Sequence, residues 1–265
     1  MYKIRYYHQR KHWPDLKHPQ DLSEILISRI LSGDFVKYAP YVDKIAVRDY
    51  VKSKGLEKNL LKHYHYWDDA NDIKSEELPD KFVLKTNNGA GGKDIFVCRD
   101  KNLFDLEAAK VQLSLAQKKK YDYEMQYNKI KSRVICEELI DTGSDAWPVD
   151  YKFTCIHGKP IDIFIGSQRE KGVKFCTRNL DYSELKNTRE SYLPDVVPPK
   201  PKHLEEMIRV ATILSQDFDF VRVDLYEYND QVYFGELTFS PWGGIMYSYT
   251  DEAIKEYGAL LRNSK

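Results

Sequence analysis

Two acidic residues near the end of the chain, Asp224 and Glu236, carry the clearest chemical signal in the sequence. Each lies in a run of alternating apolar and polar residues, 220–228 and 232–238, which is typical of β-strands with one face on a core. The dipeptide Asn229-Asp230 between the two runs predicts a tight turn. A three-residue loop would pair Asp224 with Glu236, whereas a two-residue loop would shift the pairing by one position.

Two carboxylates on one face of a hairpin repel each other unless a cation lies between them. Magnesium, held by a pair of acids and completed by phosphate oxygens, meets that requirement. Arg222 and Thr238 would share the same face. The alternative is therefore an exposed hairpin on which Arg222 simply pairs with Asp224, and the hairpin alone leaves both interpretations open.

A second candidate site is the glycine-rich segment 87–92, which lies between two short strand-like runs, 81–86 and 94–98. Glycines let backbone N–H groups approach a ligand closely, and successive amides can bind phosphate oxygens. The segment matches neither a Walker loop nor a Rossmann fingerprint, because a strand follows where a helix would begin. Three lysines in neighbouring elements could reach phosphates, although each could instead be a solvated charge: Lys44, Lys85 and Lys152.

The elements that must position these residues alternate between helices and strands. Helices are expected at 21–33, where Asp21 and Glu24 form a capping box, and at 41–55, 105–119 and 204–214. Further strands are expected at 134–140, 149–157 and 161–167. His63 to Tyr66 are interpreted as an aromatic surface turn. Such interleaving predicts a mixed α+β or α/β fold.

Composition restricts the kinds of function. The chain has 265 residues, 42% of them hydrophobic, which is enough for one large domain or two small lobes. Its formal net charge is zero, so we expect no nucleic-acid partner. No apolar run approaches the ~20 residues of a membrane span, and the first residues lack the apolar core of a signal peptide. The four cysteines are widely spaced and are expected to be reduced core thiols, so we predict a cytoplasmic protein.

Taken together and in this order, these residues resemble the ATP-grasp superfamily. The resemblance runs through Asp43-Lys44, Lys85, the glycine loop, the acidic segment 137–140, Lys152 and the closing pattern RVD…ELTFSPWG. The TupA-like branch, associated with teichuronopeptide and cell-surface polysaccharide biosynthesis, is similar over most of residues 40–260. The segments LPDKFVLKTNNGAGG, ICEELI, DYKFTCIHGKPI and FVRVDLYEYNDQVYFGELTFSPWGG carry this closer resemblance.

The resemblance implies an ATP-grasp fold, an α+β architecture in which two lobes, about 81–140 and 141–265, clasp ATP behind a short helical region at 1–80. Lys85 and Lys152 would hold the nucleotide phosphates, with help from Lys44. The remaining nucleotide contacts it implies are Asn88, Gly89, Gly91 and Gly92 in the loop, Glu137, Glu138, Leu139 and Ile140 around adenine, and Asp145 at the ribose.

The same resemblance implies Mg²⁺ on Asp224 and Glu236, and a catalytic role at the transferring phosphoryl group for Arg222 and Lys152. Thr238 would be a weaker metal ligand, because many relatives have asparagine there. The candidate substrate-binding residues are Arg169, Arg178, Ser240, Trp242 and Gly243. The two arginines could clamp a carboxylate bidentately, but could equally be surface residues.

The reaction implied is the ATP- and Mg²⁺-dependent ligation of a carboxylate to an amine through an acyl phosphate. The expected partners are a small-molecule or saccharide carboxylate and an amine or amino acid, and the product would be a uronic acid amide of a capsule-like or teichuronopeptide-like polysaccharide. A kinase that phosphorylates a sugar or alcohol hydroxyl would use the same phosphate and metal residues. A non-catalytic glycan- or nucleotide-binding protein is a third interpretation, disfavoured because both acids and all three lysines are present.

Overall fold

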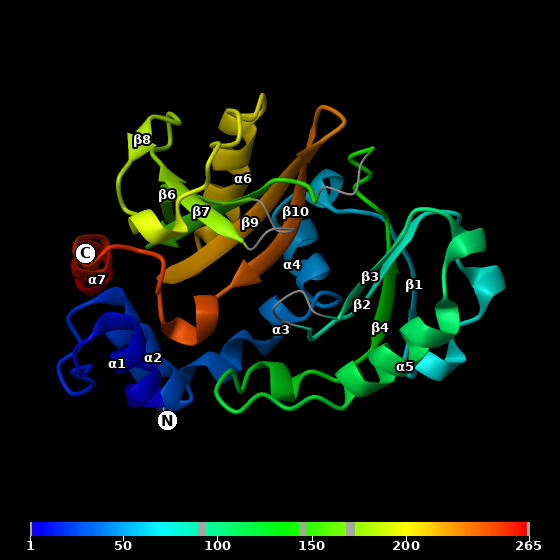
Figure 1. Ribbon diagram of the computed structural model, residues 1–265, viewed down its shortest axis with the longest axis horizontal. Helices are drawn as coiled ribbons and strands as arrows, with labels where there is room; N and C mark the ends of the chain where they lie inside the picture. The colour runs from blue at the N-terminus through cyan, green and yellow to red at the C-terminus, as the bar shows by residue number, and fades with distance from the viewer. Residues whose placement is uncertain (1, 90–93, 144–146, 168–172, 264–265) are drawn as a thin grey trace. The chain divides into compact units, whose positions relative to one another are not determined.

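A computed structural model describes residues 2–89, 94–143, 147–167 and 173–263. The chain divides into two compact units, a larger one of Met1–Phe35 with Asp145–Lys265 and a smaller one of Val36–Ser144 (Figure 1). Each unit contains one antiparallel β-sheet with helices, which confirms the predicted mixed α+β class. The predicted 1–80 region is shared between the two units, because residues 1–35 pack with the C-terminal part of the chain.

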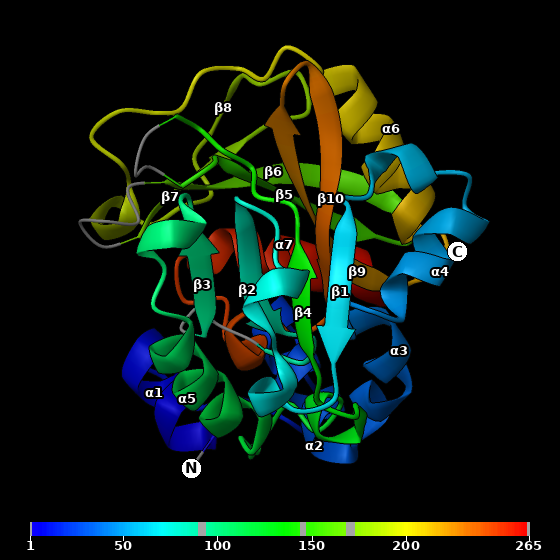
Figure 2. The same ribbon diagram turned by 90° about the vertical axis from the view of Figure 1, so that its right-hand side faces the viewer.

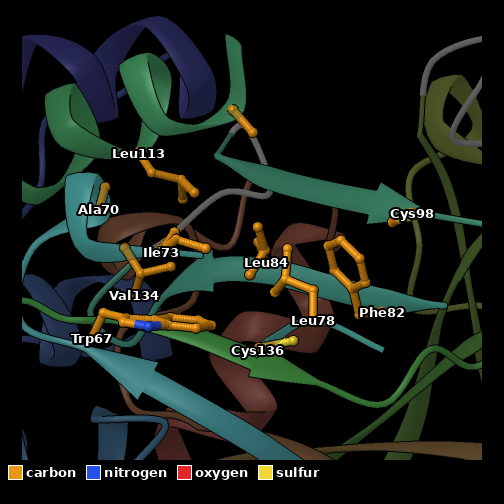
Figure 3. Close-up of a cluster of buried hydrophobic side chains, with 11 residues drawn as sticks. Trp67, Ala70, Ile73, Leu78, Phe82, Leu84, Cys98, Leu113, Val134 and Cys136 are labelled. Atoms are coloured by element: carbon orange, nitrogen blue, oxygen red, sulfur yellow. The ribbon is translucent and has the colours of Figure 1, made fainter. Parts of the chain in front are cut away.

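The smaller unit is built on a four-stranded antiparallel sheet with the strand order β1-β4-β2-β3 (Figure 2). Its strands are β1 (His63–Trp67), β2 (Phe82–Thr86), β3 (Ile95–Cys98) and β4 (Val134–Glu137). Its helices are α3 (Ala39–Val42), α4 (Val47–Ser53) and α5 (Leu106–Gln117). Leu113 of α5 joins Trp67, Leu84 and Val134 of the sheet in a buried apolar cluster (Figure 3).

Two local predictions for the smaller unit are wrong. The helix expected over residues 41–55 is two short helices, because Asp43 leaves the helical conformation with φ −71° and ψ 114°. Its carboxylate instead accepts a hydrogen bond of 2.8 Å from the N–H of Ile45. The turn expected at His63 to Tyr66 is strand β1, in which His63 pairs with Glu137 of β4.

The larger unit is built on a six-stranded antiparallel sheet with the order β10-β9-β5-β6-β7-β8. Its strands are β5 (Asp150–Ile156), β6 (Lys159–Ser167), β7 (Lys174–Arg178), β8 (Glu184–Leu185), β9 (Phe220–Tyr228) and β10 (Gln231–Thr238). Its helices are α1 (Tyr2–Arg10), α2 (Leu22–Ser32), α6 (Leu204–Ser215) and α7 (Asp251–Arg262). Helix α6 packs on β5, β6 and β9, and α2 packs against α7.

Several sequence-based predictions for these elements are confirmed. Helix α2 begins with the capping box of Asp21 and Glu24 and ends at Gly33, whose φ of 83° is left-handed. All four cysteines are free and buried. None of the helices in the described part of the chain is long and apolar enough to cross a bilayer.

The β9–β10 hairpin reaches the predicted pairing by a different route. Its turn has two residues, Asn229 and Asp230, with φ of 48° and 56°, as in a type I′ turn. The register then shifts by one position at Gly235, so that Asp224 still pairs with Glu236. The bulge at Gly235 therefore compensates for the shorter turn.

Replacing Gly235 with alanine tests the importance of this bulge. A Cβ atom there would lie 2.7 Å from the Tyr226 ring and 3.0 Å from the Asp224 carbonyl oxygen, so strand pairing must shift. We expect Gly235→Ala to lower the free energy of unfolding by about 1–3 kcal/mol in urea denaturation. The matched control is Gly166→Ala in β6, where the nearest atom, of Phe175, is 3.6 Å away and no clash arises. Equal stability of the two variants would contradict this account.

Candidate active site

One face of the six-stranded sheet carries five charged side chains from three neighbouring strands. The register aligns Lys152 of β5, Asp224 of β9 and Glu236 of β10 in one row. Side chains alternate between the two faces of a strand, so Asp150 and Arg222, two residues before Lys152 and Asp224, lie on the same face. We call these five residues the charged face. It brings together four of the residues predicted from the sequence for metal binding and catalysis.

The centre of the charged face is the buried carboxylate of Asp224, which is 1% exposed. Arg222 donates to both of its oxygens, from Nε to Oδ1 at 2.7 Å and from Nη2 to Oδ2 at 2.8 Å. Lys152 Nζ donates to Asp224 Oδ2 and also to Asp150 Oδ2. Burial acts to raise the pKa of Asp224, but Arg222 and then Lys152 outweigh it and hold that pKa below its ordinary value. Asp224 is therefore ionised at neutral pH.

Glu236 is the more accessible acid, with a side chain that is 40% exposed. Its Oε1 accepts a 3.2 Å hydrogen bond from the Thr238 hydroxyl and lies 3.9 Å from Arg222 Nη2. The charged face thus holds two cations and three carboxylates, which leaves one net negative charge. An anion would be repelled here unless a cation accompanied it. Among the described residues, no group of three or more His, Cys, Asp or Glu side chains is placed to hold a metal.

Trp242 lies over the same face of the sheet. The Arg222 guanidinium carbon is 5.5 Å from the centre of the Trp242 ring. The indole also makes edge contacts with Phe164 and Phe175, at centroid distances of 5.2 and 5.6 Å. Phe164 pairs with Lys152 across β5 and β6, so it shares the charged face. Ser240 is buried at the start of this segment.

The backbone of this segment has an unusual conformation. Trp242 has φ 52° and ψ 33°, in the left-handed region that bulky side chains rarely adopt, and Gly243 follows with φ 66°. Helix α1 of the same unit holds the segment through hydrogen bonds to its carbonyl groups. Tyr2 donates to Gly243 O at 2.6 Å, and Arg5 Nη2 donates to Trp242 O at 3.3 Å. The position of Trp242 therefore depends partly on α1.

The predicted substrate residue Arg178 lies on the opposite face of the sheet. It pairs with Ile163, and Ile163 pairs with Phe153. Phe153 is the residue next to Lys152 in β5, so its side chain points to the other face of the sheet. Its guanidinium carbon is 5.9 Å from the Tyr182 ring centre. The larger unit therefore does not bring Arg178 together with the charged face. Two further predicted site residues, Arg169 and Asp145, lie outside the described residues.

In the smaller unit, the predicted phosphate ligand Lys85 is paired with the predicted hinge residue Glu137. Lys85 Nζ donates to Glu137 Oε1, and His63 Nε2 lies 3.5 Å from Oε2. Burial acts to raise the pKa of Glu137, but the charge of Lys85, with smaller contributions from His63, brings that pKa down to about 2. Glu137 is therefore ionised at neutral pH.

The first residues of the glycine loop are tied to other parts of the smaller unit. Lys44 Nζ donates to Gly89 O at 2.7 Å. The hydroxyl of Tyr121 donates to Asn88 O, and that of Ser132 to Asn88 Oδ1, both at 2.9 Å. The structure thus brings Lys44, Asn88 and Gly89 together. Gly91 and Gly92 lie outside the described residues.

The predicted hinge segment follows the end of β4. The strand ends at Glu137 rather than at Ile140, and Glu138 to Ile140 have no regular secondary structure. Glu138 makes a reciprocal pair with Lys62, donating from its N–H to Lys62 O at 2.8 Å and accepting the Lys62 N–H at Oε2 at 3.2 Å. The Glu138 N–H is therefore engaged within the protein.

Three residues of these sites were not identified from the sequence: Asp150, Gly235 and Tyr2. Asp150 stands two positions before Lys152 in a strand, and that spacing could have placed it on the same face. An isolated glycine in a strand is a known sign of a bulge, which applies to Gly235. Tyr2 is 241 residues away from the carbonyl group that it binds, and no local pattern predicts such a contact.

Comparison with solved structures gives relatives with low sequence identity. The D-alanine–D-alanine ligase of Helicobacter pylori is 18% identical, with a TM-score of 0.48 over 85% of this chain and 61% of that one. The corresponding Bacillus anthracis ligase is 15% identical, with a TM-score of 0.49 over 84% and 65%. The ATP-grasp ligase PsnB, complexed with minimal precursor, Mg and ADP, is 14% identical, with a TM-score of 0.45 over 90% and 66%. The chain spans less than two thirds of the length of the two D-alanine–D-alanine ligases. No curated protein matches the sequence.

A family model gives a more extensive match. The model described as TupA-like ATPgrasp matches residues 24–262. The matched region includes the whole charged face, Trp242, Lys44, Lys85 and the glycine loop. The chain therefore belongs to the TupA-like ATP-grasp family.

Proposed function

We propose that the protein is an ATP- and Mg²⁺-dependent ligase that joins a carboxylate to an amine through an acyl phosphate. The observation that carries this proposal is the charged face, where buried Arg222 and Lys152 share Asp224 beside the more exposed Glu236. ATP-grasp ligases use ATP and Mg²⁺, in agreement with the cofactors predicted from the sequence. The charged face is therefore interpreted as the part of the protein that binds the metal and the transferring phosphoryl group.

The residues present fit a magnesium ion. Carboxylate oxygens of Asp224 and Glu236 are the hard ligands that Mg²⁺ prefers, and Thr238 offers a weaker hydroxyl oxygen. The net negative charge of this face favours a phosphate that arrives with a cation over a free phosphate. When bound, Mg²⁺ would leave coordination positions for phosphate oxygens and would neutralise part of their charge.

Each of the four predicted cations has a distinct proposed role. Arg222 and Lys152 lie beside Asp224, and when Mg²⁺ takes an oxygen of Asp224 from them they would be placed to stabilise charge on the transferring phosphoryl group. Lys85, assisted by Lys44 and the glycine loop, would hold the other nucleotide phosphates. Residues 137–140 would contact adenine. Ser240, Trp242 and Gly243 would line the end of the site where the substrates react.

The proposed reaction has two steps. A carboxylate oxygen of the acid substrate attacks the γ-phosphorus of ATP, the bond to the bridging oxygen breaks, and ADP leaves. The amine nitrogen then attacks the acyl carbon, inorganic phosphate leaves, and the nitrogen loses a proton. The proposed substrates are a uronic acid and an amino acid, in cytoplasmic steps of cell-surface polysaccharide biosynthesis. The support for these substrates is the family to which the chain belongs.

Replacing Glu236 with glutamine tests the metal assignment. An amide is a poor Mg²⁺ ligand, and the exposure of this side chain allows the fold to persist. We expect Glu236→Gln to lower turnover by at least about 100-fold and to weaken the Mg²⁺-dependent binding of ADP in calorimetry. Glu205→Gln, on the exposed side of α6, is the matched control and should behave as the parent protein. Unchanged Mg²⁺ dependence in Glu236→Gln would contradict the assignment.

The role of Lys85 can be separated from its contribution to folding. Lys85→Ala leaves Glu137 buried with its main partner removed, so stability should fall as well as nucleotide affinity. The double variant Lys85→Ala/Glu137→Gln removes both charges and should recover stability. We expect its affinity for Mg·ATP to stay weakened by about 1–3 kcal/mol, the scale of one charge-assisted hydrogen bond. Parental affinity in the stable double variant would reject the phosphate role.

Hydroxylamine trapping distinguishes a ligase from a kinase. An acyl phosphate reacts with hydroxylamine, so a true acid substrate should give ADP, phosphate and a hydroxamate in equal amounts. A screen of uronic acids with ATP, followed by colorimetric detection of hydroxamate, would identify that substrate. A kinase would instead leave the phosphoryl group on a product hydroxyl, with no free phosphate. A stable phosphorylated sugar as the main product would overturn the ligase proposal.

A further inference from the structure

The segment that contains α1 is strongly basic, although the whole chain has zero net charge. Residues 1–20 include one acidic residue, Asp15. The basic residues of this segment, apart from its histidines, are Lys3, Arg5, Arg10, Lys11 and Lys17. All of them except the buried Arg10 are exposed. This segment precedes residues 24–262, which match the family.

Helix α1 has one face in the protein and one face in solvent. Tyr2, Tyr6 and Arg10, spaced four residues apart, form the buried stripe. Ile4 and Tyr7 lie on the other side and are 53% and 39% exposed. Figure 1 shows α1 at the outer edge of the larger unit, beside α2.

Trp13, just beyond the helix, enlarges the exposed apolar area. It is 60% exposed and stacks on Tyr7 with a centroid distance of 4.7 Å and an interplanar angle of 28°. We use the name α1 surface for the apolar residues Ile4, Tyr7 and Trp13 with the basic residues Lys3, Lys11 and Lys17. Exposed aromatic and aliphatic groups among cations are the composition of segments that bind at membrane interfaces.

We propose that the α1 surface docks the protein on a membrane surface of anionic lipid. The cations would bind acidic headgroups, while Trp13 and Ile4 would enter the boundary between headgroups and acyl chains. A helix of nine residues is about 13 Å long, so α1 would lie in the interface. A nucleic acid fits this surface less well, because Tyr7 and Trp13 each use one ring face to stack on the other.

Vesicle sedimentation tests the proposal with the full chain. The protein should sediment with vesicles of phosphatidylcholine and phosphatidylglycerol, and should stay in solution with phosphatidylcholine alone. Binding should weaken as salt is raised, because the attraction is partly electrostatic. Lys3→Gln/Lys11→Gln should reduce partitioning roughly 20-fold. Ile4→Ala/Trp13→Ala should also reduce it, and the tryptophan emission shift on binding should vanish.

The matched control is Lys118→Gln/Lys120→Gln. It also removes two exposed lysines, but these belong to the smaller unit and are not part of the α1 surface. This variant should bind vesicles as the parent protein does. Failure of the parent protein to sediment with phosphatidylglycerol vesicles would overturn the proposal. Equal losses of vesicle binding in the control and in the α1 variants would also overturn it. Binding of the parent protein to heparin but not to vesicles would overturn it as well. Ligase activity is not needed for any of these measurements.

Discussion

The interaction on which the larger unit's site depends is the buried carboxylate of Asp224, shared by Arg222 and Lys152. Three charged groups can be buried together only when they form hydrogen bonds and ion pairs with one another. The pairing of β5 with β9 therefore cannot shift by even one residue. A shift of one position would turn these side chains to the α6 side of the sheet. The bulge at Gly235 extends the same requirement to β10, because it returns Glu236 to the row of Asp224.

The smaller unit uses the same physical arrangement. Lys85 is fixed by Glu137 of the neighbouring strand, as Lys152 is fixed by Asp224. In both units a lysine that would otherwise be flexible is pre-positioned by an acidic partner, which lowers the cost of organising it around a phosphate. Trp242 adds a third constraint, because its left-handed backbone is stabilised by hydrogen bonds from α1 to the carbonyl groups around it. In each unit, hydrogen bonds and ion pairs within the protein therefore hold these side chains.

Local patterns predicted much of the fold, and long-range geometry explains the remainder. The capping box of α2 and the alternation in β9 were readable because they depend on neighbouring residues. The route to the Asp224–Glu236 pairing could not be predicted in this way. It depends on a two-residue turn and on a bulge at Gly235, whose opposite effects on the register are separated along the hairpin. The face on which Arg178 lies depends on the pairing of β7 with β6, which periodicity within one strand cannot set. Strand β1 was missed because its sequence, HYHYW, lacks apolar alternation, and helix α7 was not predicted although Thr250 caps it.

The central claim is that the charged face binds the metal that accompanies the nucleotide. A crystal structure of the protein with Mg²⁺ and a non-hydrolysable ATP analogue tests it most directly. The account predicts a magnesium ion within about 2.5 Å of carboxylate oxygens of Glu236 and Asp224, with the remaining positions taken by phosphate oxygens and water. A magnesium ion coordinated by phosphates while both carboxylates stay bound only to Arg222, Lys152 and Thr238 would contradict it.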